Sequence, residues 1–310
     1  MKLETCVLSF VRHIESALQG FYPPDECRAL AWWVAEETTG LSRTQIITGC
    51  KGTKIIPNIE IILQRLQKKE PIQYIFGHTL WMGLDLQLSP ATLIPRPETA
   101  ELVDFIAQDQ ATQISSPLSG SPQAMRSGVV SGRDGVGLSV LDIGTGSGCI
   151  AIALKRQHPE WNVYGLDISE EALAIARGNA ERNHTPVAFA QCDILRQTPL
   201  PTNQEGKKVT FQIVVSNPPY IADREKAQMD ASVLDYEPHS ALFVPDRDPL
   251  LFYRRIAELR LAPYLYFELN EAYAQQTADM LQSMGYRDII LKNDSYGKPR
   301  ILAARTDLPR

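Results

Sequence analysis

The sequence lacks the short motifs that identify several common classes of enzyme. It contains no HxxxH pair among its five histidines, no GxSxG and no GxxxxGK[ST], so zincin, α/β-hydrolase and P-loop chemistry have no support. The five cysteines are widely scattered and show no CxxC spacing. We therefore expect no metal site, and reduced thiols that act as small apolar residues. The cysteines are Cys6, Cys27, Cys50, Cys149 and Cys192.

The chain also lacks a basic excess and a long apolar run. Its 31 Lys and Arg face 36 Asp and Glu, which gives a net charge of −5 at pH 7. A duplex-DNA binder uses excess positive charge to displace counterions from phosphates, so this balance disfavours a nucleic-acid partner. Near the N-terminus Glu4 and Arg12 interrupt the apolar residues, and no run elsewhere approaches the length of a membrane span. We expect a cytoplasmic protein without a membrane partner.

Residues 1–75 predict a small helical domain, because their apolar residues recur at helical spacing. We expect Asp25 to cap a helix that ends at Gly40, and the spacing of Ser42 and Gln45 predicts a capping box. Positive and negative charges nearly cancel in this segment. Both a substrate-docking module and a scaffold without a ligand of its own fit this pattern.

The pattern of residues 76–107 predicts a hinge into a second domain. Residues 84–89 alternate apolar and polar side chains, as a half-exposed strand does. A helix is expected to begin at Pro97, with the acidic Glu98 in its first turn. Residues 108–139 are dominated by Ser, Gly, Pro and Gln, and we expect a flexible surface insertion without chemistry.

Residues 140–310 alternate predicted strands with helices. This alternation implies right-handed crossovers and an α/β fold with a parallel sheet covered on both faces. The last two strands resemble a hairpin. The expected strands are SVLDIG (139–144), NVYGLDI (162–168), VAFAQCD (187–193), FQIVVSN (211–217), YLYFELN (264–270), DIILKND (288–294) and RILAAR (300–305).

Three glycines follow the first of these strands at alternate positions, namely Gly144, Gly146 and Gly148. Glycine lets the backbone turn sharply and approach a ligand without interference from a Cβ atom. The spacing is GxGxG rather than the dinucleotide GxGxxG, and no basic residue lies in the loop to meet a phosphate. A ligand that carries a nucleoside but no pyrophosphate fits better.

Carboxylates close the next two strands. Asp167 stands where an acidic residue can accept both ribose hydroxyls. Asp193 closes the third strand, where it can accept from an adenine amino group while Ile194 packs on the ring. Either Asp alone also fits a helix cap or a turn. Three successive strand ends with these features together indicate a nucleoside-cofactor site.

The fourth strand ends in Asn217-Pro218-Pro219-Tyr220. Together with the glycine-rich loop and the two strand-closing carboxylates, this strand end resembles the pattern of the seven-stranded S-adenosylmethionine-dependent methyltransferases. In that class the tetrapeptide at this place is the signature of methyl transfer to a planar nitrogen, either an exocyclic base amine or a glutamine amide.

Such a nitrogen is a poor nucleophile because its lone pair is delocalised. The Asn217 side-chain carbonyl and the Pro218 backbone carbonyl can each accept one N–H, which favours a tetrahedral nitrogen with its lone pair aimed at the methyl group. Pro219 fixes φ and removes a competing donor, so the corner is rigid before the substrate arrives. We expect Tyr220 to pack on the flat face of the acceptor and exclude water.

Outside the insertion, the chain resembles the glutamine N5-methyltransferases that modify peptide chain release factors. The resemblance rests on EPIQYIFG, LSPATLIPRPETAELV, VLDIGTGSGCIAIAL, VVSNPPYI, DYEPHSALF and YGKPRILAAR. It implies methylation of the glutamine in the Gly-Gly-Gln loop of bacterial release factors, with the helical domain helping to dock the factor. The expected cofactor contacts are Gly144, Thr145, Gly146, Ser147, Gly148, Asp167, Asp193, Ile194 and Asn217, and the expected catalytic and substrate-binding residues are Asn217, Pro218, Pro219 and Tyr220.

Other acceptors remain open. The same clamp can serve a glutamine of a ribosomal protein or a flipped adenine of nucleic acid, and a binding module that only retains the cofactor site is a third alternative. The chain also departs from the family pattern in its longer insertion and in a short connection at residues 260–263. Four residues lie near the site without an assigned atomic role, namely Arg96, Glu98, Glu237 and His239. The last two follow the clamp, where shaping the acceptor pocket is one interpretation and a plain loop position is the favoured one.

Overall fold

The structure is a computed structural model, and it divides into two compact units, each described by itself below. The first unit comprises Met1–His78 and Asp230–Tyr236, and the second comprises Thr79–Met229 and Glu237–Arg310. Most of the expected insertion, together with Cys6 and Cys50, lies outside the described residues. The described residues are 7–49, 58–115, 137–198 and 208–307.

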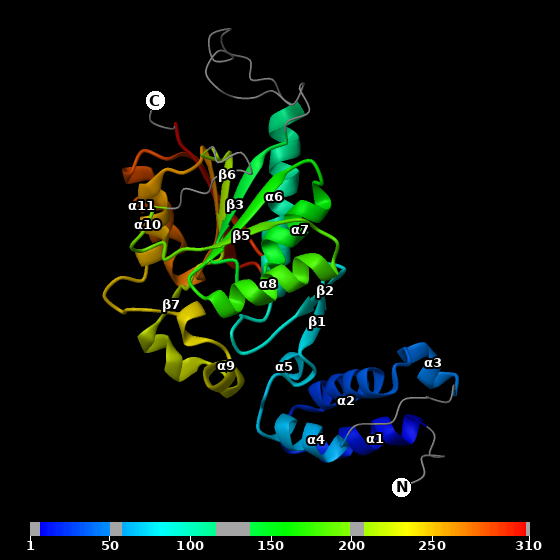
Figure 1. The fold of residues 1–310 in the computed structure, drawn as a ribbon. Helices are drawn as coiled ribbons and strands as arrows, with labels where there is room; N and C mark the ends of the chain where they lie inside the picture. Colours follow the sequence, from blue (N-terminus) through cyan, green and yellow to red (C-terminus); the bar gives the residue numbers. More distant parts are fainter. Residues whose placement is uncertain (1–6, 50–57, 116–136, 199–207, 308–310) are drawn as a thin grey trace. The chain divides into compact units, whose positions relative to one another are not determined.

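The first unit is helical, as the sequence predicts (Figure 1). Its core contains fully buried apolar side chains such as Ile14 and Leu66. The capping box of Ser42 and Gln45 is present, and Gly40 ends the preceding helix with φ 69°, a left-handed conformation that suits glycine. Its helices are α1 (Val7–Leu18), α2 (Pro24–Thr39), α3 (Arg43–Ile47), α4 (Ile59–Gln67), α5 (Ile72–Phe76) and, from later in the chain, α9 (Ala231–Tyr236).

The prediction that Asp25 caps the second helix is wrong. Helix α2 begins at Pro24, and Pro23 stands at the N-cap position without a side-chain hydrogen bond. Proline at the first helical position has φ preset and has no N–H that needs an acceptor, so the helix starts without a polar cap. Asp25 instead lies inside the first turn, where its carboxylate meets the positive end of the helix dipole.

The second unit is built on a seven-stranded sheet. Strands β6, β3, β4 and β5 run parallel, β9 is parallel to β6, and β11 pairs antiparallel with both β9 and β10. The hairpin expected at the end of the chain is therefore confirmed. In spatial order the strands are β10 (Arg287–Asn293), β11 (Pro299–Arg305), β9 (Tyr264–Glu268), β6 (Ile213–Ser216), β3 (Ser139–Ile143), β4 (Asn162–Asp167) and β5 (Ala188–Gln191).

Both faces of this sheet are buried. On β6, Val214 enters one core, whereas Ile213 and Val215 enter the other. Burial on both faces explains why the strands read as nearly continuous apolar runs. Figure 1 shows α10 and α11 on one face and α6, α7 and α8 on the other. The covering helices are α6 (Pro97–Ser115), α7 (Cys149–Gln157), α8 (Glu170–Arg182), α10 (Leu251–Leu259) and α11 (Ala274–Ser283).

A small hairpin of β1 (His78–Trp81) and β2 (Leu84–Gln87) precedes the sheet, and only β2 is predicted by the sequence pattern. Asn179 of α8 and Asn183, the residue that caps its C-terminus, hold β2 through its backbone. Asn183 accepts from Asp85 N at 3.0 Å and donates to Asp85 O at 2.9 Å. Asn179 accepts from Gln87 N at 2.6 Å and donates to Gln87 O at 3.0 Å. The side-chain amides thus take the place of a neighbouring strand.

Helix α6 begins at Pro97, as predicted, but continues to Ser115. The prediction that the insertion starts at residue 108 is therefore wrong for its first eight residues, 108–115. Gln110 is buried and donates to Tyr266 Oη at 2.7 Å, while that hydroxyl donates to Asp109. These tertiary contacts stabilise helical residues whose composition alone predicts a loop.

The short connection at residues 260–263 closes as a tight turn. Arg260 follows α10 with φ 44°, a left-handed conformation more usual for glycine at a helix end. Its guanidinium donates to Thr306 Oγ1 at 2.7 Å and to the Met284 carbonyl. Because such a backbone conformation strains a non-glycine residue, we attribute its retention to these contacts.

The remaining elements lie after the β6 strand and around α11. Strands β7 (Ile221–Ala222) and β8 (Phe243–Val244) form a parallel pair. Short 3₁₀ helices are η2 (Asp223–Gln228), η3 (His239–Ala241) and η4 (Glu271–Tyr273). Among the helices of the described residues, none combines the length and apolar character needed to cross a membrane.

Candidate active site

The candidate site lies at the carboxyl edge of the sheet, where the strand order reverses. The chain passes from β3 to β4 and β5 on one side, and β6 and β9 lie on the other side of β3. Such a reversal leaves the crevice in which open α/β sheets bind ligands. Ser216 Oγ donates to Ile143 O at 2.6 Å and ties the two strand ends together at this crevice.

The glycine-rich loop between β3 and α7 forms one wall. Gly144 and Gly146 have φ of 75° and 55°, and a Cβ atom built on either would meet no other atom within 4 Å, so both face open space. Gly148 differs, because its Cβ would meet Ile152 Cδ1 at 3.0 Å and Ala176 Cβ at 3.1 Å. The third glycine therefore allows close helix packing rather than contact with a ligand.

A buried carboxyl group lies beneath this loop. Thr145 Oγ1 donates to Asp142 Oδ2 at 2.6 Å, and Asp142 is fully buried. Burial raises the pKa of Asp142 to about 7, and the charge of Asp167 adds to the rise, while the hydrogen bonds from Thr145 and the Ala151 backbone oppose it. The loop therefore rests on a group that changes its charge near neutral pH.

A buried thiol follows the loop. Burial raises the pKa of Cys149 to about 12, so this thiol stays protonated and is no nucleophile. Among the described residues, the cysteines are free: Cys27, Cys149 and Cys192.

Asp167 closes β4 and connects two parts of the site. Its Oδ2 accepts from the Gly146 N–H at 2.8 Å, and its Oδ1 accepts from the Ser169 N–H at 2.9 Å. A carboxylate oxygen has two lone pairs, so each oxygen can still accept a ribose hydroxyl. The two sequence interpretations of this residue, turn former and ribose acceptor, are therefore compatible.

The end of β5 supplies a largely apolar wall. Asp193 Oδ1 accepts from the Leu195 N–H at 3.0 Å, and Ile194 beside it is buried. Ile168, which directly follows Asp167, is 58% exposed and faces the same pocket. Because both isoleucines line the same pocket, they can offer an apolar surface on which a nucleobase packs. Sequence reasoning missed Ile168, although its place after a strand-closing carboxylate was a usable signal.

The corner after β6 forms the opposite wall. Asn217, Pro218 and Pro219 all line the pocket. Asn217 Nδ2 donates to Thr99 Oγ1 at 3.3 Å, so the amide is held from the side of α6. Sequence reasoning did not identify Thr99, even though it lies within the IPRPET segment.

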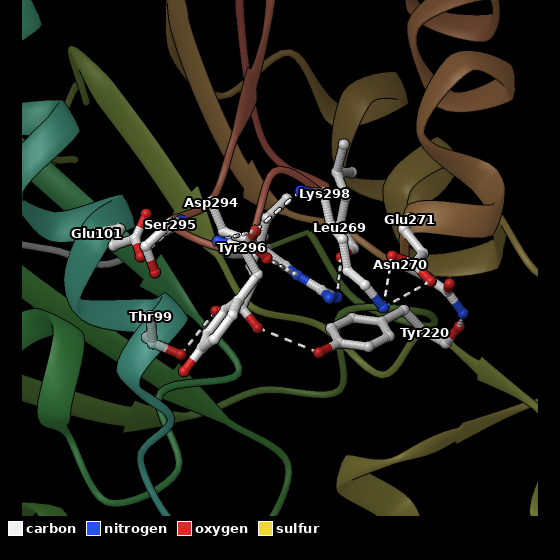
Figure 2. Close-up of polar contacts among 12 residues, drawn as sticks. Thr99, Glu101, Tyr220, Leu269, Asn270, Glu271, Asp294, Ser295, Tyr296 and Lys298 are labelled. Atoms are coloured by element: carbon white, nitrogen blue, oxygen red, sulfur yellow. Dashed lines mark hydrogen bonds and ion pairs between the residues drawn. The ribbon is translucent and has the colours of Figure 1, made fainter. Parts of the chain in front are cut away.

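Tyr220 does not line the pocket. Its hydroxyl donates to Glu268 Oε1 at 3.1 Å, and its backbone carbonyl accepts from Asn270 Nδ2 at 3.1 Å (Figure 2). Burial, followed by the charge of Glu268, raises the pKa of the Tyr220 hydroxyl, which therefore stays protonated. The structure thus gives Tyr220 an anchoring contact in the core, and its predicted packing against an acceptor stays a prediction.

Glu237 is more than a loop residue. Only 1% of its side chain is exposed, and Arg96 Nη2 donates to its Oε1 at 2.6 Å. The Ile94 N–H also points to this carboxylate, at 3.4 Å. His239 does not itself line the pocket, although its neighbours Pro238 and Ser240 do, and its ring packs edge-on against Phe243. Glu98 occupies the first turn of α6.

These walls enclose one pocket of about 480 Å³, a size suited to a small-molecule cofactor. It brings together every sequence-predicted site residue except Gly148 and Tyr220. Arg96 is the only basic residue among the lining residues that the structure describes, whereas Asp167, Glu171 and Asp193 supply negative charge. The open space above the glycines, the carboxylates and the apolar wall fit S-adenosylmethionine, a nucleoside with a positive sulfonium and no phosphate.

The sheet order and this pocket define a class I methyltransferase. A model of the methyltransferase small domain matches residues 133–234. The catalytic domain of hMettl16, solved in complex with MAT2A 3′UTR hairpin 1, aligns over 82% of this chain and 92% of that chain with a TM-score of 0.52. At 12% identity, that likeness concerns the fold alone.

The chain belongs to the release factor glutamine methyltransferase family. It is 43% identical to the release factor glutamine methyltransferase of Bacteroides thetaiotaomicron over 305 residues, which is 94% of this chain and 97% of that protein. It is 41% identical over 248 residues to the enzyme of the same name from Flavobacterium psychrophilum, covering 78% of each chain. The predicted class I fold and the predicted family are both confirmed.

Proposed function

We propose that this protein transfers a methyl group from S-adenosylmethionine to the side-chain amide nitrogen (N5) of the glutamine in the Gly-Gly-Gln loop of peptide chain release factors. The observation that carries the proposal is the position of Asn217, which lines one pocket with Gly144 and Asp167. The corner that can clamp a planar NH2 therefore faces the cofactor pocket. Membership of the family supports the choice of acceptor.

When bound, S-adenosylmethionine supplies an electrophilic methyl group. Gly144, Gly146 and Asp167 would hold its ribose and amino-acid parts, and Ile168 and Ile194 would pack on its base. The carboxylates of the pocket complement the positive sulfonium.

The chain's own part in the chemistry is to activate and orient the acceptor amide. Asn217 Oδ1 and the Pro218 carbonyl each accept one N–H of the glutamine, which withdraws the nitrogen lone pair from the amide π system. The two prolines hold this geometry before the substrate arrives, so little ordering is needed on binding. Tyr220 stabilises the corner through its anchored hydroxyl.

The partner implied is a class I release factor, met in the cytoplasm where translation ends. We assign docking of the factor to the helical first unit, none of whose described residues lines the pocket. A membrane partner has no role in this proposal.

The test compares three acceptors in one assay with S-adenosylmethionine labelled on its methyl group. Release factor purified from cells without the endogenous enzyme should gain label, whereas ribosomal proteins from the same cells and adenine-containing DNA or RNA should not. Asn217→Ala should abolish the transfer even at S-adenosylmethionine concentrations that saturate the variant. Label found on a ribosomal protein or on nucleic acid, but not on release factor, would refute the proposed acceptor.

A further inference from the structure

A chain of three polar side chains leads from the corner into the core of the second unit. Asn217 Nδ2 donates to Thr99 Oγ1 at 3.3 Å, and Thr99 Oγ1 donates to Glu268 Oε2 at 2.6 Å. Glu268 closes β9, the strand beside β6, and is only 1% exposed. Nothing in the activation of an amide requires a buried carboxylate at this place, so its presence needs its own explanation.

The polarity of this chain follows from the carboxylate. An ionised carboxylate can only accept hydrogen bonds, so the single proton of the Thr99 hydroxyl must point to Glu268. The Thr99 oxygen can then only accept from Asn217, which places the NH2 end of that amide against Thr99. The carbonyl end, Oδ1, is thereby turned the other way, and it is the end that an acceptor N–H needs.

The same carboxylate holds the other end of the corner. Tyr220 Oη donates to Glu268 Oε1 at 3.1 Å, whereas Thr99 donates to the other carboxylate oxygen, Oε2. Asn270 Nδ2 fixes the Tyr220 carbonyl at 3.1 Å. Without Glu268, Thr99 and Tyr220 would both lose their acceptor. The contacts that hold Asn217 and Tyr220, the first and the last residue of the tetrapeptide, would be weakened together.

Each oxygen of Glu268 accepts one hydroxyl donor, Thr99 on Oε2 and Tyr220 on Oε1, which is the arrangement that an ionised carboxylate makes. Burial raises the pKa of its carboxyl and the charge of Glu98 adds to the rise, whereas these two hydrogen bonds and the charge of Arg300 oppose it. Arg300 is itself fixed, since its Nη1 donates to Leu269 O at 2.9 Å and its Nε lies 3.4 Å from Asp294 Oδ2.

We propose that Glu268 is a positioning residue that, through Thr99, sets the orientation of the Asn217 amide and so gives the methyl-acceptor clamp its accepting end. The inference rests on the proposed function in that the clamp must accept N–H groups. Glu268 does not touch substrate or cofactor; it acts through Thr99 and Tyr220.

The kinetic test uses substitutions at Thr99 that differ by one hydroxyl. Thr99→Val keeps the shape of the side chain but removes the hydroxyl. We expect kcat for release factor methylation to fall about tenfold, because one hydrogen bond no longer orients the Asn217 amide. KM for the release factor and Kd for S-adenosylmethionine should stay within about twofold, because the effect lies on the chemical step. Thr99→Ser keeps the hydroxyl and should recover most of the kcat.

Two further variants separate orientation from packing. Glu268→Gln presents one oxygen and one NH2, so it can accept from Thr99 or from Tyr220 but not from both, and its kcat should lie between those of the wild type and Thr99→Val. Thr277→Val is the matched control, because Thr277 is a fully buried threonine whose hydroxyl donates to Tyr273 O at 2.9 Å in α11. It should leave kcat unchanged. Equal kcat for Thr99→Val and Thr99→Ser would overturn the proposal.

A measurement without acceptor keeps this inference separate from the proposed function. In the NMR spectrum of the free protein, the Asn217 side-chain NH2 signals, assigned by their loss in Asn217→Ala, should show NOEs to the Thr99 methyl group. Absence of these NOEs would mean that the amide is turned the other way and would reject the relay, whichever substrate the enzyme uses. If the NOEs are present but release factor gains no methyl group, the proposed function fails and the orientation of Asn217 stands.

Discussion

Gly146 and Asp167 are joined by a hydrogen bond from the Gly146 N–H to Asp167 Oδ2, at 2.8 Å. The carboxylate that closes β4 thereby holds the loop that follows β3. Its other oxygen accepts from the Ser169 N–H at the start of α8. One side chain thus fixes the shape of the glycine-rich loop and stands in the pocket where ribose hydroxyls are expected.

Asp167→Ala should therefore weaken cofactor binding strongly. It removes a loop contact and two acceptors for ribose, so we expect Kd for S-adenosylmethionine to rise roughly 30- to 100-fold. Isothermal titration calorimetry measures this directly. Asp279→Ala, at an exposed position of α11, is the control and should bind normally. A Kd for Asp167→Ala close to that of the wild type would contradict the assignment of this residue to the cofactor.

Asp142 predicts a dependence of stability on pH. The raised pKa of about 7 means that the folded protein binds a proton below neutral pH, whereas an exposed Asp, whose ordinary pKa is 3.8, does not until the pH is much lower. The folded state therefore gains stability as the pH falls through about 7, by up to about 1.4 kcal/mol for each pH unit, until the unfolded chain also binds its proton.

Urea unfolding of the wild type and Asp142→Asn at several pH values tests this. The variant mimics the protonated form, so the difference in unfolding free energy should shift in favour of the wild type as the pH decreases from about 8 to about 5. Asp279→Asn, whose carboxylate is exposed, should show no comparable shift. A constant difference between wild type and Asp142→Asn over this range would show that Asp142 is ionised throughout.

The pair of Arg96 and Glu237 should matter more for folding than an exposed ion pair. Arg96→Met leaves a nearly fully buried carboxylate without its cation, so we expect a loss of about 3 kcal/mol from the unfolding transition of the second unit. Adding Glu237→Gln should restore a substantial part. Arg177→Met breaks an exposed pair with Glu170 and should cost less than about 1 kcal/mol. If Arg96→Met and Arg177→Met lose similar unfolding free energies, the buried pair stabilises the fold no more than the exposed pair does.

The sheet could be predicted from sequence because its strands are buried on both faces and alternate with amphipathic helices. Strand β1 could not, since four residues carry little periodicity. The end of α6 was missed because residues near Gln108 are polar, and only their contact with Tyr266 makes a helix favourable there. Asp25 failed as a cap because a preceding proline already sets the helix start.

In the candidate site, too, residues with a local sequence signal could be predicted and residues held by distant contacts could not. Strand ends and a rare tetrapeptide are local signals, so the glycines, Asp167 and Asn217 were found from sequence. Glu268 and Thr99 are 169 residues apart, and a hydrogen bond between them leaves no mark in spacing or composition. Glu237 was read as a loop residue because its partner Arg96 lies 141 residues away in the sequence. Contacts of this kind become visible only in three dimensions.

The most direct test of the central claim is peptide-level mass spectrometry of unmethylated release factor after incubation with this protein and S-adenosylmethionine. We predict a single added methyl group, located on the glutamine side chain of the Gly-Gly-Gln loop and absent when Asn217→Ala replaces the wild type. A release factor that remains unmodified, while the protein still binds S-adenosylmethionine, would contradict the account.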